Sequence, residues 1–251
     1  MIREITYDIY TILWQDWISF KKSFLKFLLS RMITPILYIV AFGFGLGKNV
    51  NLGTGNYLEF IIPGMIALNS MNIAYNTVAH PLAISRIYYK TLENFLIAPI
   101  NPRAIIIGKI LTGVFRAILS SSIILLIAFV LDLKLIFGIG FFAVLLLNSA
   151  VFSAIGLVVG LRVMSSEELN NFSSYILMPM SFLCGTFFST EVFPAYIKNL
   201  VGILPLTPAA NLLRGLAQGE SYDYKFICIL IIYLLITSVY AHKLLLKKSR
   251  E

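Results

Sequence analysis

Long apolar segments separated by short polar ones occupy most of this 251-residue chain. A helix that crosses a bilayer needs about 20 mostly apolar residues, and six segments meet that requirement. The chain is 59% hydrophobic and only 13% charged, whereas about a quarter of the residues in a soluble domain are charged. We therefore predict an all-α integral membrane protein with a single transmembrane domain. The predicted spans cover about residues 27–47, 57–79, 110–131, 135–161, 172–188 and 226–246.

Residues 1–26 are amphipathic rather than continuously apolar. Ile5, Ile9, Ile12, Leu13 and Trp17 recur at helical spacing, with acidic residues on the other faces. A helix of this kind lies in the plane of the membrane interface, with tryptophan rings at the depth of the lipid headgroups. We predict an interfacial helix here, and a soluble helical arm is the alternative.

A second segment that cannot cross the membrane covers residues 190–216. Pro194, Pro205 and Pro208 interrupt it and leave apolar pieces near 195–204 and 209–216. Apolar pieces of this length are typical of interfacial or re-entrant helices. We predict a short re-entrant helix pair before the last span.

The lysines and arginines determine the predicted orientation, because cytoplasmic loops carry an excess of both. With a cytoplasmic N-terminus, fifteen of the 20 lysines and arginines lie on that side. Both termini, the segment 85–109 and a polar loop at 162–171 are then cytoplasmic, and the re-entrant pair is extracytoplasmic. The net charge of +8 is thereby attributed to cytoplasmic loops and anionic lipid rather than to nucleic acid binding. The five outer residues are Lys48, Lys134, Lys198, Arg214 and Lys225.

Two patterns within the predicted spans concern helix contacts. Asn69, Asn72 and Asn76 recur on one face of the second span, and such polar side chains face protein or a water-filled path rather than lipid. They either form hydrogen bonds between helices or line a translocation path, and the sequence leaves both interpretations open. In the fourth span, Gly156 and Gly160 form a Gly-x-x-x-Gly pattern, which is typical of closely packed helices.

Residues suited to catalysis or ion coupling are scarce. His80 and His242 lie at predicted span ends, and Cys184 and Cys228 lie in apolar runs without metal-ligand spacing. The glycine-rich run 43–48 does not fit the P-loop pattern. We predict that this chain has no catalytic site and binds no metal or cofactor, so that energy for transport comes from another protein.

The charged segment 85–109 interrupts the apolar pattern on the predicted cytoplasmic side. Tyr88, Leu92, Phe95 and Leu96 fall at helical spacing, which predicts a short amphipathic helix. A cytoplasmic docking helix in a chain without an ATP site indicates a separate ATPase.

Several motifs along the whole chain resemble those of permeases of the ABC type-2 exporter family. They are YKTLENFLIAPI at 89–100, IGK at 107–109, PMSFLCGTFF at 179–188, FP at 193–194, LPLTP at 204–208 and LRG at 213–215. The LPLTP and LRG motifs are similar to those of the drug and lipo-oligosaccharide exporter branch. The resemblance implies an N-terminal interfacial helix, six spans and an extracytoplasmic re-entrant pair.

The resemblance also implies partners. Two permease subunits, here expected to form a homodimer, would sit on two ATP-binding cassette subunits that hold ATP and Mg. In this family the loop after the second span forms a coupling helix that rests on the ATPase, which corresponds here to about residues 86–96. The coupling residues implied in this way are Arg86, Tyr88, Lys90, Leu92, Glu93 and Phe95, with Glu93 in a salt bridge.

The functional prediction is therefore the permease subunit of an exporter in the cell membrane, with the first, second and fifth spans at the seam between subunits. Its predicted substrate is a lipophilic drug-like molecule, a lipid or a lipid-linked saccharide. Arg214, in the re-entrant segment, is expected to meet an anionic headgroup or to pair with Glu191 or Glu220. The alternatives are a polysaccharide exporter of the same family and a channel or scaffold that uses no ATPase.

Overall fold

The computed structural model describes residues 2–41, 57–89, 100–219 and 223–248, and every regular element in these ranges is a helix. The all-α prediction is therefore confirmed. Four of these helices are long and apolar enough to cross a membrane, or five if one bent pair counts as a span. The 31-residue α3 (Tyr57–Ile87) is not among the four, because its asparagines lower its hydropathy. A total of six spans stays a prediction.

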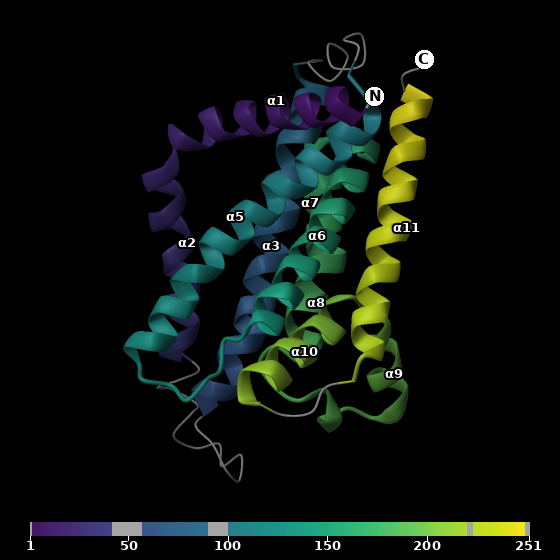
Figure 1. Ribbon diagram of the computed structural model, residues 1–251. Coiled ribbons are helices and arrows are strands. Elements are labelled where there is room, and N and C mark those ends of the chain that lie inside the picture. The colour runs from purple at the N-terminus through teal and green to yellow at the C-terminus, as the bar shows by residue number, and fades with distance from the viewer. Residues whose placement is uncertain (1, 42–56, 90–99, 220–222, 249–251) are drawn as a thin grey trace.

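The helices form an elongated bundle whose two ends differ (Figure 1). Helix α1 (Ile2–Lys21) lies across one end, and the chain then turns into α2 (Phe24–Tyr38), which runs along the bundle. Helix α11 (Lys225–Lys248) runs along the opposite side and finishes at the same end as α1. Helices α9 (Ala195–Ile203) and α10 (Leu206–Gln218) occupy the other end. We call the two ends the α1 end and the α10 end.

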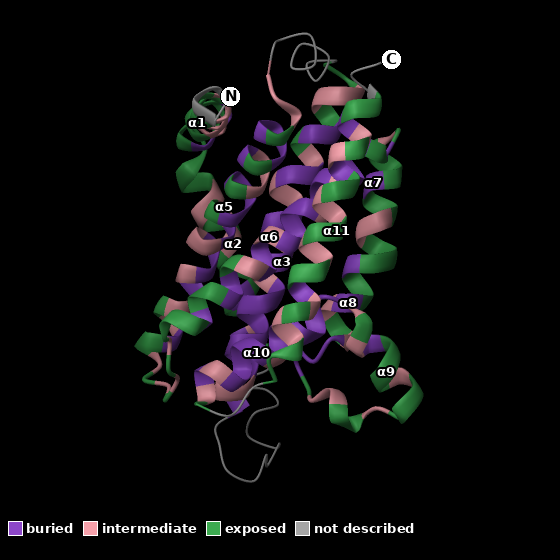
Figure 2. Ribbon diagram, turned by 45° about the vertical axis from the view of Figure 1, so that its right-hand side comes forward, coloured by how far each residue is buried: buried purple, intermediate pink, exposed green. Residues whose placement is uncertain are grey.

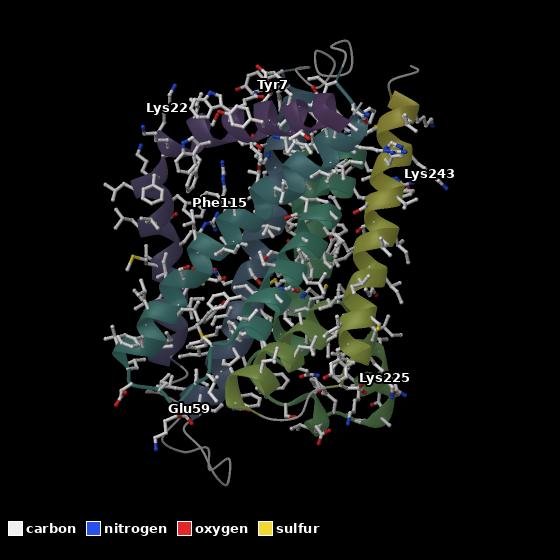
Figure 3. All side chains as sticks on the ribbon, viewed as in Figure 1. Tyr7, Lys22, Glu59, Phe115, Lys225 and Lys243 are labelled. Atoms are coloured by element: carbon white, nitrogen blue, oxygen red, sulfur yellow. The ribbon has the colours of Figure 1, made fainter. Side chains whose placement is uncertain are left out.

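The charged residues labelled in Figure 3 follow this division. Lys22 and Lys243 lie at the α1 end, whereas Glu59 and Lys225 lie at the α10 end. This is the arrangement that the lysine and arginine pattern predicts if the α1 end faces the cytoplasm. The orientation itself stays a prediction.

Helix α3 lies at the centre of the bundle, with α5 (Pro102–Val130) and α6 (Ile139–Arg162) packed against it. A Cβ atom on Gly156 would lie 2.8 Å from the carbonyl oxygen of Tyr75, and one on Gly160 would lie 3.0 Å from that of Ala79. Only glycine permits such an approach, so the predicted role of this pair in close helix packing is confirmed.

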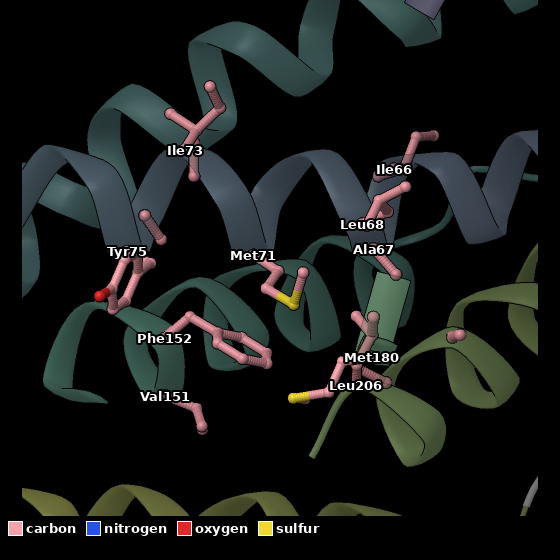
Figure 4. Close-up of a cluster of buried hydrophobic side chains, with 14 of the residues drawn as sticks. Ile66, Ala67, Leu68, Met71, Ile73, Tyr75, Val151, Phe152, Met180 and Leu206 are labelled. Carbon is pink, nitrogen blue, oxygen red and sulfur yellow. The ribbon is translucent and has the colours of Figure 1, made fainter. Parts of the chain in front are cut away.

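The interior of the bundle is filled by large apolar side chains. Figure 4 shows Met71 and Tyr75 of α3 near Phe152 of α6, with Met180 and Leu206 closing the cluster from the α10 end. Figure 2 shows that buried residues concentrate on α3, α6 and α10, while α11 leaves one side exposed. In a membrane protein, exposed apolar faces of this kind contact lipid or a second subunit.

One helical run, Ser166–Leu183, replaces most of the predicted loop 162–171 and fifth span 172–188. It consists of α7 (Ser166–Phe172), the π-helical turn η2 (Ser173–Leu177) and α8 (Met178–Leu183). The loop prediction is wrong from residue 166 onward because Ser165 caps a helix there: its hydroxyl accepts the Glu168 amide at 3.1 Å. The Glu168 carboxylate in turn accepts the Met164 amide at 2.7 Å. These reciprocal bonds resemble a capping box, so the polar residues form the first turn of a helix.

Two other predicted boundaries differ from the structure. Residues 133–138 are not helical, and the Ile136 amide donates to the carbonyl of Ala217 at 2.7 Å, so the fourth predicted span is helical only from Ile139. The predicted coupling helix does not begin at Arg86, because α3 continues through Pro81 to Ile87. The amides of Tyr88 and Tyr89 then bond back to the Ile84 carbonyl at 3.0 and 3.4 Å.

The segment predicted to be re-entrant contains the short 3-10 helix η3 (Thr190–Val192) and the two α-helices α9 and α10, which are bent by 92° relative to each other. Pro194 and Pro205 cap their N-termini, and Pro208 lies in the first turn of α10, where a missing amide breaks no helical bond. Helix α10 is almost entirely buried, whereas α9 exposes most of its residues (Figure 2). Helix α10 therefore fills the interior of the bundle at the α10 end, and α9 lies at the periphery.

Candidate functional site

Two of the predicted coupling residues, Arg86 and Tyr88, lie in the described part of the chain. The Arg86 guanidinium donates to the carbonyl of Leu161 near the end of α6, and the Tyr88 and Ser166 hydroxyls are 3.2 Å apart. Burial lowers the pKa of Arg86 below its ordinary value, and the nearby Glu168 carboxylate offsets only part of this effect. These contacts hold the end of α3 against the α6–α7 turn. The predicted coupling residues Lys90, Leu92, Glu93 and Phe95 lie outside the described residues.

Polar contacts fasten α1 to the beginning of α5. The Lys109 ammonium lies 2.8 Å from the Asp16 carboxylate, and the Thr112 hydroxyl donates to the same carboxylate at 2.9 Å. At the N-cap of α5, the Asn101 amide donates to the Asp8 carboxylate at 3.1 Å. Since α5 begins directly after the predicted coupling segment, α1 is bonded to the helix that would receive force from it.

A polar cavity of about 230 Å³ lies between α2, α3, α5 and α8. Asn69, Asn72 and Asn76, the three residues of the predicted path, all line it. Arg31 of α2 and Ser181 of α8 add polar groups from two further helices. The structure thus brings the predicted stripe together with residues that lie far from it in sequence.

The three asparagines differ in their partners. Asn69 Nδ2 donates to the Ser120 hydroxyl on α5 at 3.0 Å, and that hydroxyl lies 3.3 Å from Asn69 Oδ1. Asn72 and Asn76 donate instead to carbonyls of their own helix, those of Leu68 and Asn72, at 3.2 and 2.7 Å. Asn69 therefore connects two helices, whereas Asn72 and Asn76 bond to no other helix within the described residues. That substrate moves along this face stays a prediction.

Arg31 received no role in the sequence analysis, yet it places a positive charge beside this cavity. Its Nε is buried and has no hydrogen-bond partner among the described residues. Its guanidinium carbon lies 5.8 Å from the ring centre of Phe27, one turn earlier in α2. A charge inside a membrane helix is costly and commonly marks a ligand or ion pathway. An arginine within an apolar run was the signal that could have identified it.

At the α10 end, Arg214 of the predicted re-entrant segment is 8% exposed and bound to backbone. Its Nε donates to the Phe60 carbonyl at 3.1 Å and its Nη2 donates to the Gly185 carbonyl at 2.6 Å. Its guanidinium also stacks on the Phe60 ring, 3.7 Å from the ring centre. Of the acidic partners considered from sequence, Glu191 pairs with Lys198 at 3.0 Å, and Glu220 lies outside the described residues. Arg214 thus ties α10 to α3 and to the turn after α8.

A second cavity, of about 400 Å³ and mostly apolar, lies between α1 and α5. Trp17 and Phe20 of α1 and Phe115 and Arg116 of α5 line it, and Phe115 is visible beneath α1 in Figure 3. The Arg116 guanidinium lies 4.8 Å from the centre of the Phe20 ring. The aromatic residues of α1 therefore pack against α5 along one wall of this cavity.

The all-helical fold and its long apolar helices define a helical membrane protein. Residues 7–217 match the profile of the ABC-2 type transporter family, and the chain belongs to that family. The family resemblance inferred from sequence is confirmed.

Individual relatives cover most of the chain. The chain is 25% identical over 202 residues to the inner membrane transport permease YadH of Escherichia coli strain K12, covering 80% of this chain and 77% of that protein. It is 26% identical over 220 residues to nodulation protein J of Bradyrhizobium diazoefficiens, covering 85% of this chain and 83% of that protein. Nodulation protein J of Rhizobium meliloti is 24% identical over 212 residues, covering 82% and 79% of the two chains.

Proposed function

We propose that this chain is the membrane-spanning subunit of an ATP-driven exporter that moves an amphiphilic molecule across the cell membrane. Membership of the ABC-2 type transporter family over residues 7–217 carries the proposal. The Escherichia coli relative is an inner membrane transport permease, which supports a location in that membrane. The substrate class is a lipid, a lipid-linked saccharide or a lipophilic drug-like molecule, and both termini are cytoplasmic.

The connections of the coupling segment support a route for force. Residues 88–101 join α3 to α5, and both helices line the polar cavity. The contacts of Arg86 and Tyr88 extend the connection to α6 and α7, and the Lys109–Asp16 contact extends it to α1. Helix α1 leads into α2, which forms a third wall of the cavity. Closure of an ATPase against this segment would therefore move three cavity walls together.

The outer face of α2 supports a second copy of the chain as partner. Leu25, Leu29, Ile33 and Leu37 recur every four residues on this helix, and each is 58–68% exposed. They form one apolar stripe on the face of α2 opposite the cavity-lining residues, on a helix that the family resemblance places at the seam between subunits. A homodimer would bring the two cavities close to its central seam.

Co-purification from the native host tests the proposal. We expect the tagged chain to retain a nucleotide-binding ATPase, and the double variant Tyr88→Ala, Leu92→Ala to lose it. The matched control is Tyr196→Ala on α9: Tyr196 is 73% exposed and Tyr88 is 64% exposed, but Tyr196 lies at the α10 end. Loss of the ATPase should also abolish nucleotide-dependent transport in vesicles.

Purification of a stable chain without any ATPase, with ATP-independent flux in vesicles, would instead favour the channel alternative. Equal loss of the ATPase in the Tyr196→Ala control would show that the contact does not lie at residues 88 and 92. Retention of the ATPase is read from the same affinity column for every variant, and the chain's monodispersity is the check on folding.

A further inference from the structure

The cavity between α2, α3, α5 and α8 has the composition of an anion-binding site. We propose that it binds the phosphate-bearing head of an amphiphilic molecule, with Arg31 as the cationic group and Asn72 and Asn76 as hydrogen-bonding groups. This inference deepens the proposed function and rests on it for its role in transport. The binding itself is a property of this chain alone.

The charge of Arg31 is uncompensated by the described residues. None of the residues that line the described cavity is an aspartate or glutamate. The Arg31 Nε is buried without a partner, so its desolvation is not repaid by a carbonyl or carboxylate. Arginine presents N–H groups in a planar fork that matches the oxygens of a phosphate. An anion entering the cavity would supply the missing acceptor.

Asn72 and Asn76 can complete the coordination. Each side-chain amide has two N–H donors, and each gives one of them to a backbone carbonyl of α3. One N–H of each residue therefore remains for a ligand. Ser181 contributes less as a donor, because its hydroxyl already donates to the Leu177 carbonyl at 2.7 Å.

The size of the cavity favours a head group over a complete drug-like molecule. Its volume of about 230 Å³ equals roughly eight water molecules at about 30 Å³ each. Pockets that enclose drug-sized ligands are larger, at about 300 Å³ or more. A phosphate with a short polar group fits, whereas its apolar chains would lie outside.

The test compares two lipids that differ only in the phosphate. The full-length chain is delipidated in detergent, and native mass spectrometry measures the binding of phosphatidic acid and of diacylglycerol with the same acyl chains. We expect preferential binding of phosphatidic acid, and about a tenfold loss of that binding in Arg31→Gln, since charge-assisted hydrogen bonds to phosphate are the strong ones. Diacylglycerol binding should not change.

Further variants separate this cavity from general attraction to positive charge. Arg103→Gln removes an exposed arginine at the start of α5 and should leave phosphatidic acid binding unchanged. Arg31→Lys keeps the charge and should bind between the wild type and Arg31→Gln. Asn72→Leu combined with Asn76→Leu should weaken binding by about fivefold or more, because two hydrogen bonds to the phosphate are lost.

Three results would overturn the proposal: equal losses in Arg31→Gln and Arg103→Gln, equal binding of diacylglycerol and phosphatidic acid, or full competition by inorganic phosphate. The last would identify a free anion as the ligand. Arg31→Lys and the asparagine variant test the same cavity. The proposal can therefore still be refuted if Arg31→Gln misfolds. Binding is measured without an ATPase, so failure here is distinguishable from failure of the co-purification experiment.

Discussion

Arg31 and Arg214 both lie among apolar helices, but within the described residues only Arg214 has hydrogen-bond partners for its guanidinium. Arg214 donates to two backbone carbonyls and stacks on Phe60, whereas Arg31 Nε has no hydrogen-bond partner among the described residues. Arg214 therefore fastens α10 to the rest of the bundle. This difference indicates that hydrogen bonds keep the α10 end closed, whereas the unpaired donor of Arg31 suits the cavity to ligand binding.

The same contrast appears within the three asparagines. Asn69 exchanges hydrogen bonds with Ser120 and connects α3 to α5, whereas Asn72 and Asn76 bond only to their own helix among the described residues. A single periodic pattern therefore contains both a structural residue and two residues with unused donors. Periodicity alone could not have separated them.

The largest expected effect comes from replacing Arg214 by methionine, and Arg31→Met is the comparison. Arg214→Met should lower the free energy of unfolding by about 3 kcal/mol or more, because two buried carbonyls lose charged donors. Arg31→Met should change it by less than about 1 kcal/mol, since no hydrogen bond of the described structure is lost. Thermal unfolding in detergent measures both. Equal destabilisation by the two variants would remove the contrast between them.

A smaller effect tests the packing around Arg214 without changing its charge. A Cβ on Gly64 would lie 2.5 Å from the Thr186 carbonyl and 3.1 Å from Arg214 Nη2, so Gly64→Ala should destabilise the protein by about 1–3 kcal/mol. Gly202 of α9 has open space at the same position. Gly202→Ala is the matched control and should be neutral or slightly stabilising. A Gly64→Ala protein with an unchanged unfolding temperature would show that the α10 end can rearrange to accommodate the added methyl group.

The smallest effects should separate the asparagines. Asn69→Leu should cost about 1 kcal/mol of stability through the lost bond to Ser120, with little direct effect on ligand binding. Asn72→Leu should leave stability nearly unchanged but reduce transport in vesicles. If the variant with all three asparagines replaced by leucine folds and transports at the wild-type rate, this face is not part of the path.

The elements that follow from hydropathy and periodicity were predictable. The all-helical fold, the amphipathic character of α1 and the close packing at Gly156 and Gly160 depend on local sequence or on one helix face. Helix α7 was missed because Ser165 and Glu168 were read as polar loop residues although they cap a helix. In that case the sequence contained the signal and the interpretation was incomplete.

The polar cavity could not be derived in the same way. Arg31, Asn72 and Ser181 are far apart in the chain and meet only because α2, α3 and α8 surround one space. Likewise, the partners of Arg214 are backbone carbonyls of Phe60 and Gly185, and backbone acceptors leave no trace in a residue pattern. Sequence identified polar residues in unusual places, whereas the packing of helices decided which of them were satisfied.

The attachment of α1 to α5 also sets an order of events during synthesis. Asp16 and Lys109 are 93 residues apart in the chain, so their contact cannot form when α1 first leaves the ribosome. Until the helix containing Lys109 has been made, α1 is joined to the growing protein through α2, which follows it directly in the chain. Helix α1 is thus synthesised before α5 but can take its final place only after α5 is available.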